Sequence, residues 1–265
     1  MMRLHGLAAG LALSGLLAAP AFAEDAGVWP GLRADIFGAA AIAEEDGSVK
    51  LDAPVRAEDA SLVPLTITIP TTAGNAVTKL TLIVDENPSP VVATFVFGPA
   101  SGAGERTLTT RVRFDRYTNV RVVTQTADEK LHMTTKFVKA SGGCSAPAGK
   151  DADAALEGAG RMQVRTTAGK SPSGVNQALV MIKHPNFTGM QMDQLTRDYT
   201  PARYIDEMTV SSGDQLVFKM TGGISISENP HFIFTYPSGP KAGLTVTARD
   251  STGAMFTGKS AESGT

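Results

Sequence analysis

Apolar and polar residues alternate with a period of two along much of the chain, which is typical of strands that have one face on a core and one in water. In the segment 63–69, for example, apolar side chains alternate with threonines. Runs rich in Val, Ile, Thr and Phe, separated by clusters of Gly, Pro, Asn and Asp, predict two groups of strands. The first group is 63–69, 77–84, 92–97, 107–114, 120–126 and 131–138, and the second is 177–183, 202–210, 215–220, 231–236, 244–248 and 254–258.

A short stretch near the start favours a helix. The segment 29–37 has Pro30 in its first turn and Gly38 directly after it, which predicts a helix with these ends. Between 139 and 175 the period-two pattern fails, apart from one or two helical turns near 153–157 and a short strand at 162–166.

The predicted fold is therefore all-β, with a short N-terminal helix and two immunoglobulin-like β-sandwiches joined by a flexible Gly-rich linker. The first sandwich spans 24–140, the linker 141–175, and the second sandwich 176–265.

The first 23 residues have the three parts of a cleavable export signal: a positive start, an apolar run over 7–19, and Ala21-Phe22-Ala23 before Glu24. A membrane anchor is the alternative, but His5 and Pro20 interrupt the uncharged run and a cleavage pattern ends it. We expect a signal peptide over 1–23 and a periplasmic protein that does not span a membrane after cleavage.

Composition narrows the class of protein. The chain of 265 residues is 42% hydrophobic and 19% charged, which describes a globular protein rather than a fibre or a disordered chain. Lys and Arg number 24 against 26 Asp and Glu, so electrostatic binding of nucleic acid has no support.

The chain has one cysteine, Cys144, so no intramolecular disulfide is possible. It lies in Ser141-Gly142-Gly143-Cys144-Ser145-Ala146-Pro147, where the paired glycines leave the backbone free and the neighbours bury little apolar area. The segment is expected to be mobile and the thiol exposed and able to carry a covalent adduct. The alternatives are an incidental loop residue, a dimerising thiol and a buried core cysteine.

The sequence gives little support for a Cys-His catalytic pair, a metal site or a phosphate-binding loop. No Cys-His signature adjoins Cys144, and each of His132, His184 and His231 is interpreted as a structural histidine. No metal-ligand cluster has a recognised spacing, so neither a metal nor another cofactor is expected. The glycine-rich stretch 98–104 joins two predicted strands and is interpreted as a loop rather than a phosphate-binding cradle.

Several motifs occur in the order found in two known proteins. The first half contains Val63-Pro64-Leu65-Thr66-Ile67, Glu86-Asn87-Pro88-Ser89-Pro90 with Ala93-Thr94-Phe95, and Gly142-Gly143-Cys144. The second half contains Lys183-His184-Pro185 with Thr188-Gly189, Ala202-Arg203-Tyr204-Ile205, and Asn229-Pro230 before Phe232-Ile233-Phe234. Over nearly all of the mature chain, the sequence resembles the sulfur-carrier proteins SoxY and SoxZ of thiosulfate oxidation, joined in one polypeptide.

The resemblance implies a carrier with no active site of its own, whose two sandwiches pair. It assigns Cys144 as the covalent attachment residue, Gly142 and Gly143 as the hinge, and sulfur-oxidation enzymes as partners. Fused versions also resemble a subfamily that accompanies quinoprotein dehydrogenases, which implies a dehydrogenase and a c-type cytochrome as other partners. Here Ser145 and Ala146 replace the family's second glycine pair and the chain continues, so the arm is tethered at both ends. That departure puts thiosulfate as the cargo, and entry into a deep partner channel, in doubt.

The first functional hypothesis is a periplasmic carrier that presents a sulfur species, or another thiol-reactive small molecule, on Cys144 to redox enzymes. The alternative is a non-covalent adaptor for a quinoprotein dehydrogenase or cytochrome, in which the cysteine is incidental. A thiol hydrolase or oxidoreductase is the least favoured, because no base adjoins Cys144 and the chain has no CxxC.

Overall fold

The computed structural model describes residues 27–71, 77–147, 152–167, 175–193, 196–237 and 243–261. The predicted signal peptide lies outside these residues. None of the helices within the described ranges is long and apolar enough to cross a membrane. The elements are α1 (Trp29–Phe37), β1 (Ile42–Glu44), β2 (Lys50–Asp52), β3 (Val63–Ile69), β4 (Val77–Val84), β5 (Val91–Phe97), η1 (Pro99–Ser101), β6 (Arg106–Val112), β7 (Thr118–Thr126), β8 (Leu131–Val138), α3 (Ala152–Leu156), β9 (Met162–Thr167), β10 (Val175–Ile182), β11 (Ile205–Ser212), β12 (Gln215–Gly222), β13 (His231–Pro237), β14 (Leu244–Asp250) and β15 (Met255–Lys259).

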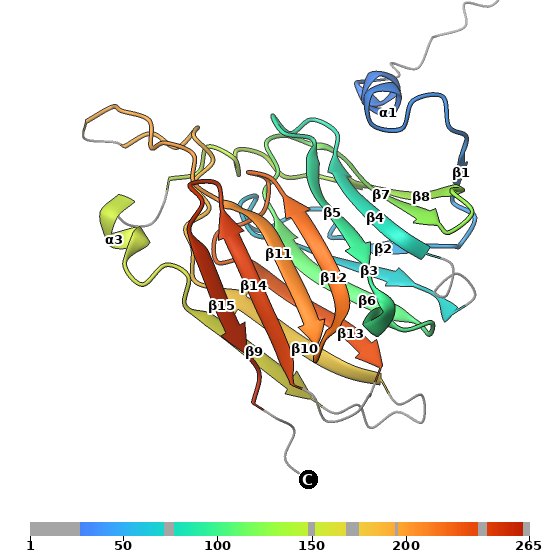
Figure 1. Cartoon of the computed structure of the whole chain (residues 1–265). Helices are drawn as coiled ribbons and strands as arrows, with labels where there is room; N and C mark the ends of the chain where they lie inside the picture. Colours follow the sequence, from blue (N-terminus) through green and yellow to red (C-terminus); the bar gives the residue numbers. More distant parts are fainter. Residues whose placement is uncertain are drawn as a thin grey trace, which may run out of the picture.

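The strands form two stacked sheets (Figure 1). The order in the nine-stranded sheet is β1-β8-β7-β4-β5-β12-β11-β14-β15, and in the six-stranded sheet it is β2-β3-β6-β13-β10-β9. Along a strand, buried residues alternate with more exposed ones, as β3 and β6 show most clearly, so one face of each of these strands is buried. The prediction of an all-β fold of sandwich type with a short N-terminal helix is confirmed.

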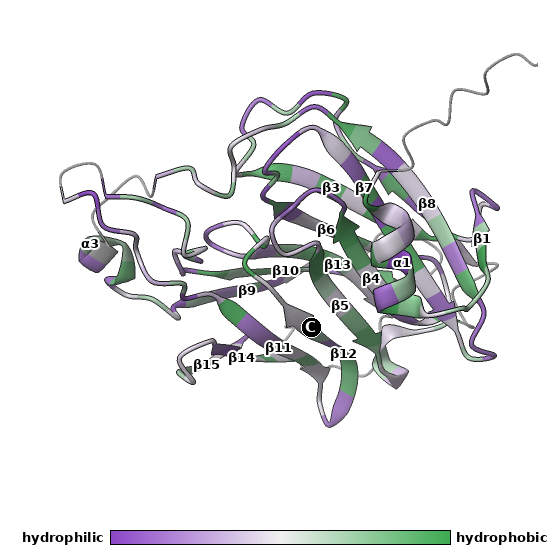
Figure 2. Cartoon of the chain, turned by 90° about the horizontal axis from the view of Figure 1, so that it is seen from above, coloured by the Kyte–Doolittle hydropathy of each residue, from purple (hydrophilic) through white to green (hydrophobic). Residues whose placement is uncertain are grey.

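Both sheets run through the two halves of the chain without interruption. The predicted strands of the two halves meet where β5 pairs with β12 and β6 pairs with β13, in each case antiparallel. Four phenylalanines pack at this seam with ring centroids 5.0 to 6.3 Å apart: Phe95, Phe218, Phe232 and Phe234. The pairing of the two sandwiches is thus a shared core, seen from above in Figure 2 as two layers that each contain strands from both halves.

The long strands occur close to where the sequence pattern predicts them, and three of them, β3, β4 and β8, have the predicted ends. β11 begins at Ile205 rather than at 202, and β9 covers the short strand expected at 162–166. β9 pairs along its length with β10, so this part of the predicted linker belongs to the six-stranded sheet.

Helix α1 lies against the outer face of the nine-stranded sheet. Trp29, Ile36 and Phe37 pack on a small apolar cluster that includes Ile83 and Met133. Because α1 covers this side, the end of β4 is buried on both faces. The opposite face of β4 packs into the main core between the sheets. Helix α1 therefore shields one face of this strand from water, and the main core shields the other.

Candidate functional site

Cys144 is fully buried, with no exposed surface. The expectation of an exposed thiol on a mobile segment is therefore wrong for this conformation. Its neighbours Ser141, Gly142 and Ser145 are exposed, so the segment does lie at the surface. The backbone turns the side chain inward at Gly142, whose φ of +82° lies in the left-handed region that favours glycine.

The backbone before Cys144 is hydrogen-bonded to the segment that follows β6. The Gly142 N–H donates to the Asp115 carbonyl at 2.8 Å, and the Gly143 N–H donates to the Phe114 carbonyl at 2.8 Å. A Cβ at Gly143 would lie 2.0 Å from the Ala60 carbonyl oxygen, so only glycine allows this close approach. In this structure Gly143 serves packing, and the hinge role of Gly142 and Gly143 stays a prediction.

The backbone after Cys144 is held by the other half of the chain. The Thr188 hydroxyl donates to the Cys144 carbonyl at 2.7 Å, and the Gln191 amide donates to the Ala146 carbonyl at 3.1 Å. The Thr188 N–H in turn donates to the Gln191 side-chain oxygen at 3.1 Å. We call residues 187–191 the covering loop; because it comes from the second half, Cys144 lies at the seam between the halves.

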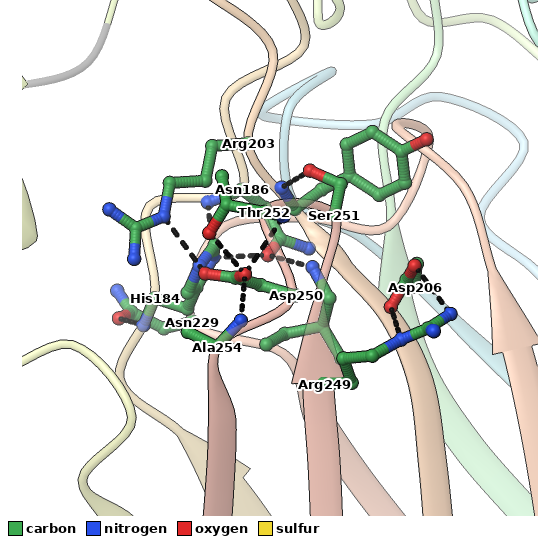
Figure 3. A network of polar contacts seen from close by, with 12 residues as sticks. His184, Asn186, Arg203, Asp206, Asn229, Arg249, Asp250, Ser251, Thr252 and Ala254 are labelled. Carbon is green, nitrogen blue, oxygen red and sulfur yellow. Dashed lines mark hydrogen bonds and ion pairs between the residues drawn. The ribbon is translucent and has the colours of Figure 1, made fainter.

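The covering loop follows a buried polar network around His184, Asn186 and Asp250, drawn in Figure 3. The Asn186 N–H donates to His184 Nδ1 at 3.1 Å, and the Asn186 side-chain amide donates to the Ile226 carbonyl at 3.3 Å. The Ile205 N–H donates to Asn186 Oδ1 at 3.2 Å. Asn186 therefore joins the start of the covering loop to the first residue of β11 and to the segment before β13.

Asp250 lies at the centre of this network. Its carboxylate accepts hydrogen bonds from Arg203 Nε at 2.8 Å, from the Thr252 hydroxyl at 2.6 Å and from the Ala254 N–H at 3.0 Å. Burial alone raises the pKa of Asp250, but these hydrogen bonds outweigh it and hold the pKa at about 2. His184 Nε2 is 3.6 Å from the carboxylate, and burial lowers the pKa of His184, so the imidazole is neutral at neutral pH.

A second buried asparagine, Asn87, fixes the other side of the site. Its amide nitrogen donates to the Arg113 carbonyl at 2.7 Å and to the Ser225 hydroxyl at 3.1 Å, and its oxygen accepts the Asp115 N–H at 2.9 Å. Asn87 thus positions the segment that holds Gly142 and Gly143. Its motif, Glu86-Asn87-Pro88, carries part of the sequence resemblance, and this contact gives the motif a structural role.

The surroundings of Cys144 suppress its reactivity. Removal from water is the main cause that raises the pKa of the thiol, to about 12, with Asp115 adding to the rise and Arg113 opposing it. Because the thiolate is the nucleophile, a thiol of this pKa is inert at neutral pH. An adduct can form on it only if the segment opens to water.

Arg113 is the charged residue of the site that sequence reasoning missed. It follows β6, is 2% exposed, and donates from Nη1 to the Gly143 carbonyl at 3.1 Å. The sequence marked it only as part of a strand, since it lies inside the predicted segment 107–114. Thr188 belongs to one of the motifs that carry the sequence resemblance, Thr188-Gly189, whereas nothing in the sequence pointed to Gln191.

The histidines are placed apart from the thiol chemistry. His132 Nδ1 contacts an Asp46 oxygen at 2.5 Å on the first half, and His184 belongs to the network of Asp250. Neither contributes to the pKa of Cys144. Across the described ranges, no group of three or more His, Cys, Asp or Glu side chains is arranged to hold a metal ion.

Comparison with known proteins matches both halves of the chain. Residues 33–144 match the family described as sulfur oxidation protein SoxY, and residues 164–261 match that described as sulphur oxidation protein SoxZ. A search of curated proteins returned no match. The SoxY match ends at Cys144 itself.

Solved structures similar to the chain include the sulfur carrier protein SoxY from Chlorobium limicola f thiosulfatophilum. That protein is 28% identical, with a TM-score of 0.34, over 42% of this chain and 90% of its own. Superoxide reductase (neelaredoxin) from Ignicoccus hospitalis is 13% identical, with a TM-score of 0.30, over 38% of this chain and 95% of its own. The order of the two family matches, one on each half of a continuous sandwich, shows that the chain belongs to the SoxY and SoxZ sulfur-oxidation carrier proteins, fused here into one polypeptide.

Proposed function

We propose that this protein is a periplasmic covalent carrier that presents a sulfur intermediate on Cys144 to sulfur-oxidation enzymes. The observation that carries the proposal is the position of the chain's only cysteine, at the last residue of the SoxY match and against the SoxZ-like half. The periplasmic location rests on the leader pattern of residues 1–23.

Carriage requires that the segment 141–147 moves from the closed position described above. Its backbone is held to the rest of the protein by the contacts to Asp115, Phe114, Arg113, Thr188 and Gln191. A typical hydrogen bond contributes about 1 kcal/mol, so opening costs a few kcal/mol and leaves a small open population. Rotation at Gly142 and Gly143 would bring the thiol into water, where its pKa returns toward the ordinary value.

Intact mass of protein isolated from the periplasm without reductant tests this proposal. We expect adducts of sulfur-containing mass that disappear on reduction and are absent from Cys144→Ser. The mature chain should begin at Glu24. A thiol that is always free, or a serine variant that retains the cellular role, would contradict carriage.

The burial of Cys144 favours one other function, the non-covalent adaptor. In that case the fused sandwich recognises a quinoprotein dehydrogenase or a c-type cytochrome, and the thiol serves packing. Affinity isolation with wild type and Cys144→Ser separates the two functions. An adaptor keeps both its partner and its cellular role in the serine variant, whereas a carrier keeps at most the partner.

A further inference from the structure

The six-stranded sheet has a groove of about 480 Å³ on the face that points away from the main core, across β6, β13, β10 and β9 (Figure 1). We call it the basic groove, because three of the side chains that line it are cations and, in the described part of the chain, none is Asp or Glu. The side chains that the argument uses are Arg111, Arg161, Met162, Met181 and Lys183.

Alternation along the strands directs these side chains out of the core. In β10, Met181 and Lys183 flank Ile182, which belongs to the main core, so both point to the opposite side of the sheet. In β6, Arg111 precedes the core residue Val112 and points outward for the same reason. Cations from neighbouring strands therefore gather on one surface.

Two of these cations lie directly opposite each other. The Lys183 N–H donates to the Arg161 carbonyl at 2.8 Å, which continues the pairing of β10 with β9 by one residue. Lys183 Nζ donates to the Glu157 carbonyl, and Arg161 Nε donates to the Gly158 carbonyl at 3.4 Å, so both contacts are to backbone. Like charges at opposed positions of a strand pair destabilise a sheet. The fold thus keeps an unfavourable pair at the surface.

Arg111 adds a third positive charge to the groove. None of the ion pairs formed within the described residues includes Arg111, Arg161 or Lys183. Arg111 Nε is buried and has no hydrogen-bond partner among the described residues. His231 lies opposite Met181 in the pairing of β10 with β13, and its pKa is lowered by burial and by the charge of Arg111. The positive charge of the groove is therefore not balanced by carboxylates of these residues.

The size and lining of the groove indicate what would balance it. Its volume equals that of about sixteen water molecules at about 30 Å³ each, so the groove accepts more than one inorganic oxyanion. Met162 and Met181 add flexible apolar surface beside the cations, and methionine is common where a surface accepts varied partners. Arg161 is exposed, so a large molecule can reach the groove. A peptide segment with carboxylates around an apolar side chain has the matching chemistry.

We propose that the basic groove docks an acidic segment of a partner protein, whose carboxylates contact Arg111, Arg161 and Lys183 and whose apolar side chain lies on Met181. The groove is an interaction surface in addition to the cysteine site. It does not depend on what Cys144 carries, because a carrier and an adaptor both have to bind a partner.

A titration of the full mature chain with two short peptides tests the proposal. The probe is acetyl-Asp-Glu-Leu-Asp-Glu-amide, and the matched neutral peptide is acetyl-Asn-Gln-Leu-Asn-Gln-amide. In two-dimensional NMR spectra of the ¹⁵N-labelled protein, we expect the acidic peptide to shift amide signals of β9, β10 and the end of β6 and to reach saturation. The neutral peptide should cause no such shifts. The affinity should fall at least about fivefold from about 20 to about 200 mM salt, since salt screens exposed charges.

Single substitutions place the binding on the groove. Arg161→Gln and Lys183→Gln should each weaken binding of the acidic peptide about fivefold to tenfold, as loss of a charge-assisted hydrogen bond implies. Lys136→Gln removes the same charge from an exposed position of β8, in the other sheet, and should leave the affinity unchanged. Because the opposed cations repel each other, Arg161→Gln should not lower the melting temperature, whereas a purely structural role of Arg161 predicts that it does.

Equal binding of the two peptides by wild type, or shifts confined to the nine-stranded sheet, overturns the proposal without any variant. An equal loss of affinity in Lys136→Gln would indicate attraction by net charge alone and also overturns it. Citrate serves as a small organic anion: shifts at the groove with citrate but none with the acidic peptide would assign the groove to a small molecule instead. The adduct on Cys144 is measured separately by intact mass, so failure of docking and failure of carriage are distinguishable.

Discussion

At the scale of single residues, the thiol of Cys144 is stored in a neutral form. Within the part of the chain that the structure describes, Nε and Nη2 of the buried Arg113 have no hydrogen-bond partner, so the site combines an inert nucleophile with a cation that is only partly hydrogen-bonded. A catalytic cysteine has the opposite arrangement, in which a nearby base or cation lowers the thiol pKa. The geometry is that of a buried, unreactive thiol.

The raised pKa predicts how the stability of the protein changes at alkaline pH. The unfolded chain loses the thiol proton near pH 9, whereas the folded chain keeps it until about pH 12. The stabilisation is thus complete below pH 9 and is lost as pH rises toward 12. Relative to Cys144→Ser, the free energy of unfolding of wild type should fall by up to about 1.4 kcal/mol per pH unit in this window. Denaturant unfolding of both proteins measures it, and parallel curves would contradict the burial.

Thr188 is the residue whose removal should open the site most directly. Thr188→Val keeps the shape but leaves the buried Cys144 carbonyl without its donor, which costs about 1 to 1.5 kcal/mol. Labelling of Cys144 by a thiol reagent should become about fivefold to tenfold faster. Thr257→Val, at an exposed position of β15, is the matched control. Equal labelling rates in all three proteins would show that the covering loop does not limit access.

At the scale of elements, the covering loop depends on β14, because Asp250 at the end of that strand anchors the network that precedes the loop.

The long strands of the sheets were predictable because an alternating pattern of seven or more residues is hard to mistake. β1 and β2 have three residues each and are too short to show a period. The burial of Cys144 was not predictable from its own neighbours, since Thr188, which holds its backbone carbonyl, lies 44 positions along the chain.

Asp250→Asn should weaken this element. The substitution removes the charge that accepts from Arg203 and from three other donors, and should cost about 3 kcal/mol at pH 7, as expected for a broken buried pair. Asp206→Asn breaks a more exposed pair with Arg249 and should cost less than about 1 kcal/mol.

The pH dependence of the same variant has a definite sign. The folded-state pKa of Asp250 is depressed, so its contribution is complete above the ordinary value of 3.8 and is lost as pH falls toward about 2. The stability difference between wild type and Asp250→Asn should therefore be constant above pH 4 and shrink below it, measured by urea unfolding between about pH 7 and pH 2.5. A difference that does not change with pH would mean that the carboxylate is not held ionised.

At the scale of the whole molecule, the two family halves form one structural unit. Sequence patterns identified each half but gave no sign that β5 would pair with β12, because edge pairing depends on side chains from both halves meeting at the seam. This architecture explains why the segment 141–147 that carries Cys144 is tethered at both ends. The chain leaves the first half at Cys144 and must return to place β9 at the edge of the shared six-stranded sheet.

Phe218→Ala tests the unity of the fold. Phe218 contacts Phe95 of the first half and Phe234 of the second, and loss of such a ring costs about 3 to 5 kcal/mol. We expect hydrogen exchange to accelerate by a similar factor in β4 and β7 as in β11 and β14, because the halves unfold together. Faster exchange confined to the second half would instead indicate two independent units.

The continuous sheets also bear on how the chain is made. Until the residues of β12 and β13 emerge, β5 and β6 each expose a row of unpaired amide and carbonyl groups. Such bare edges join other chains readily. A nascent or truncated polypeptide that ends after α3 is therefore expected to aggregate. The first half is protected from aggregation only after β12 and β13 have been synthesised and have paired with β5 and β6.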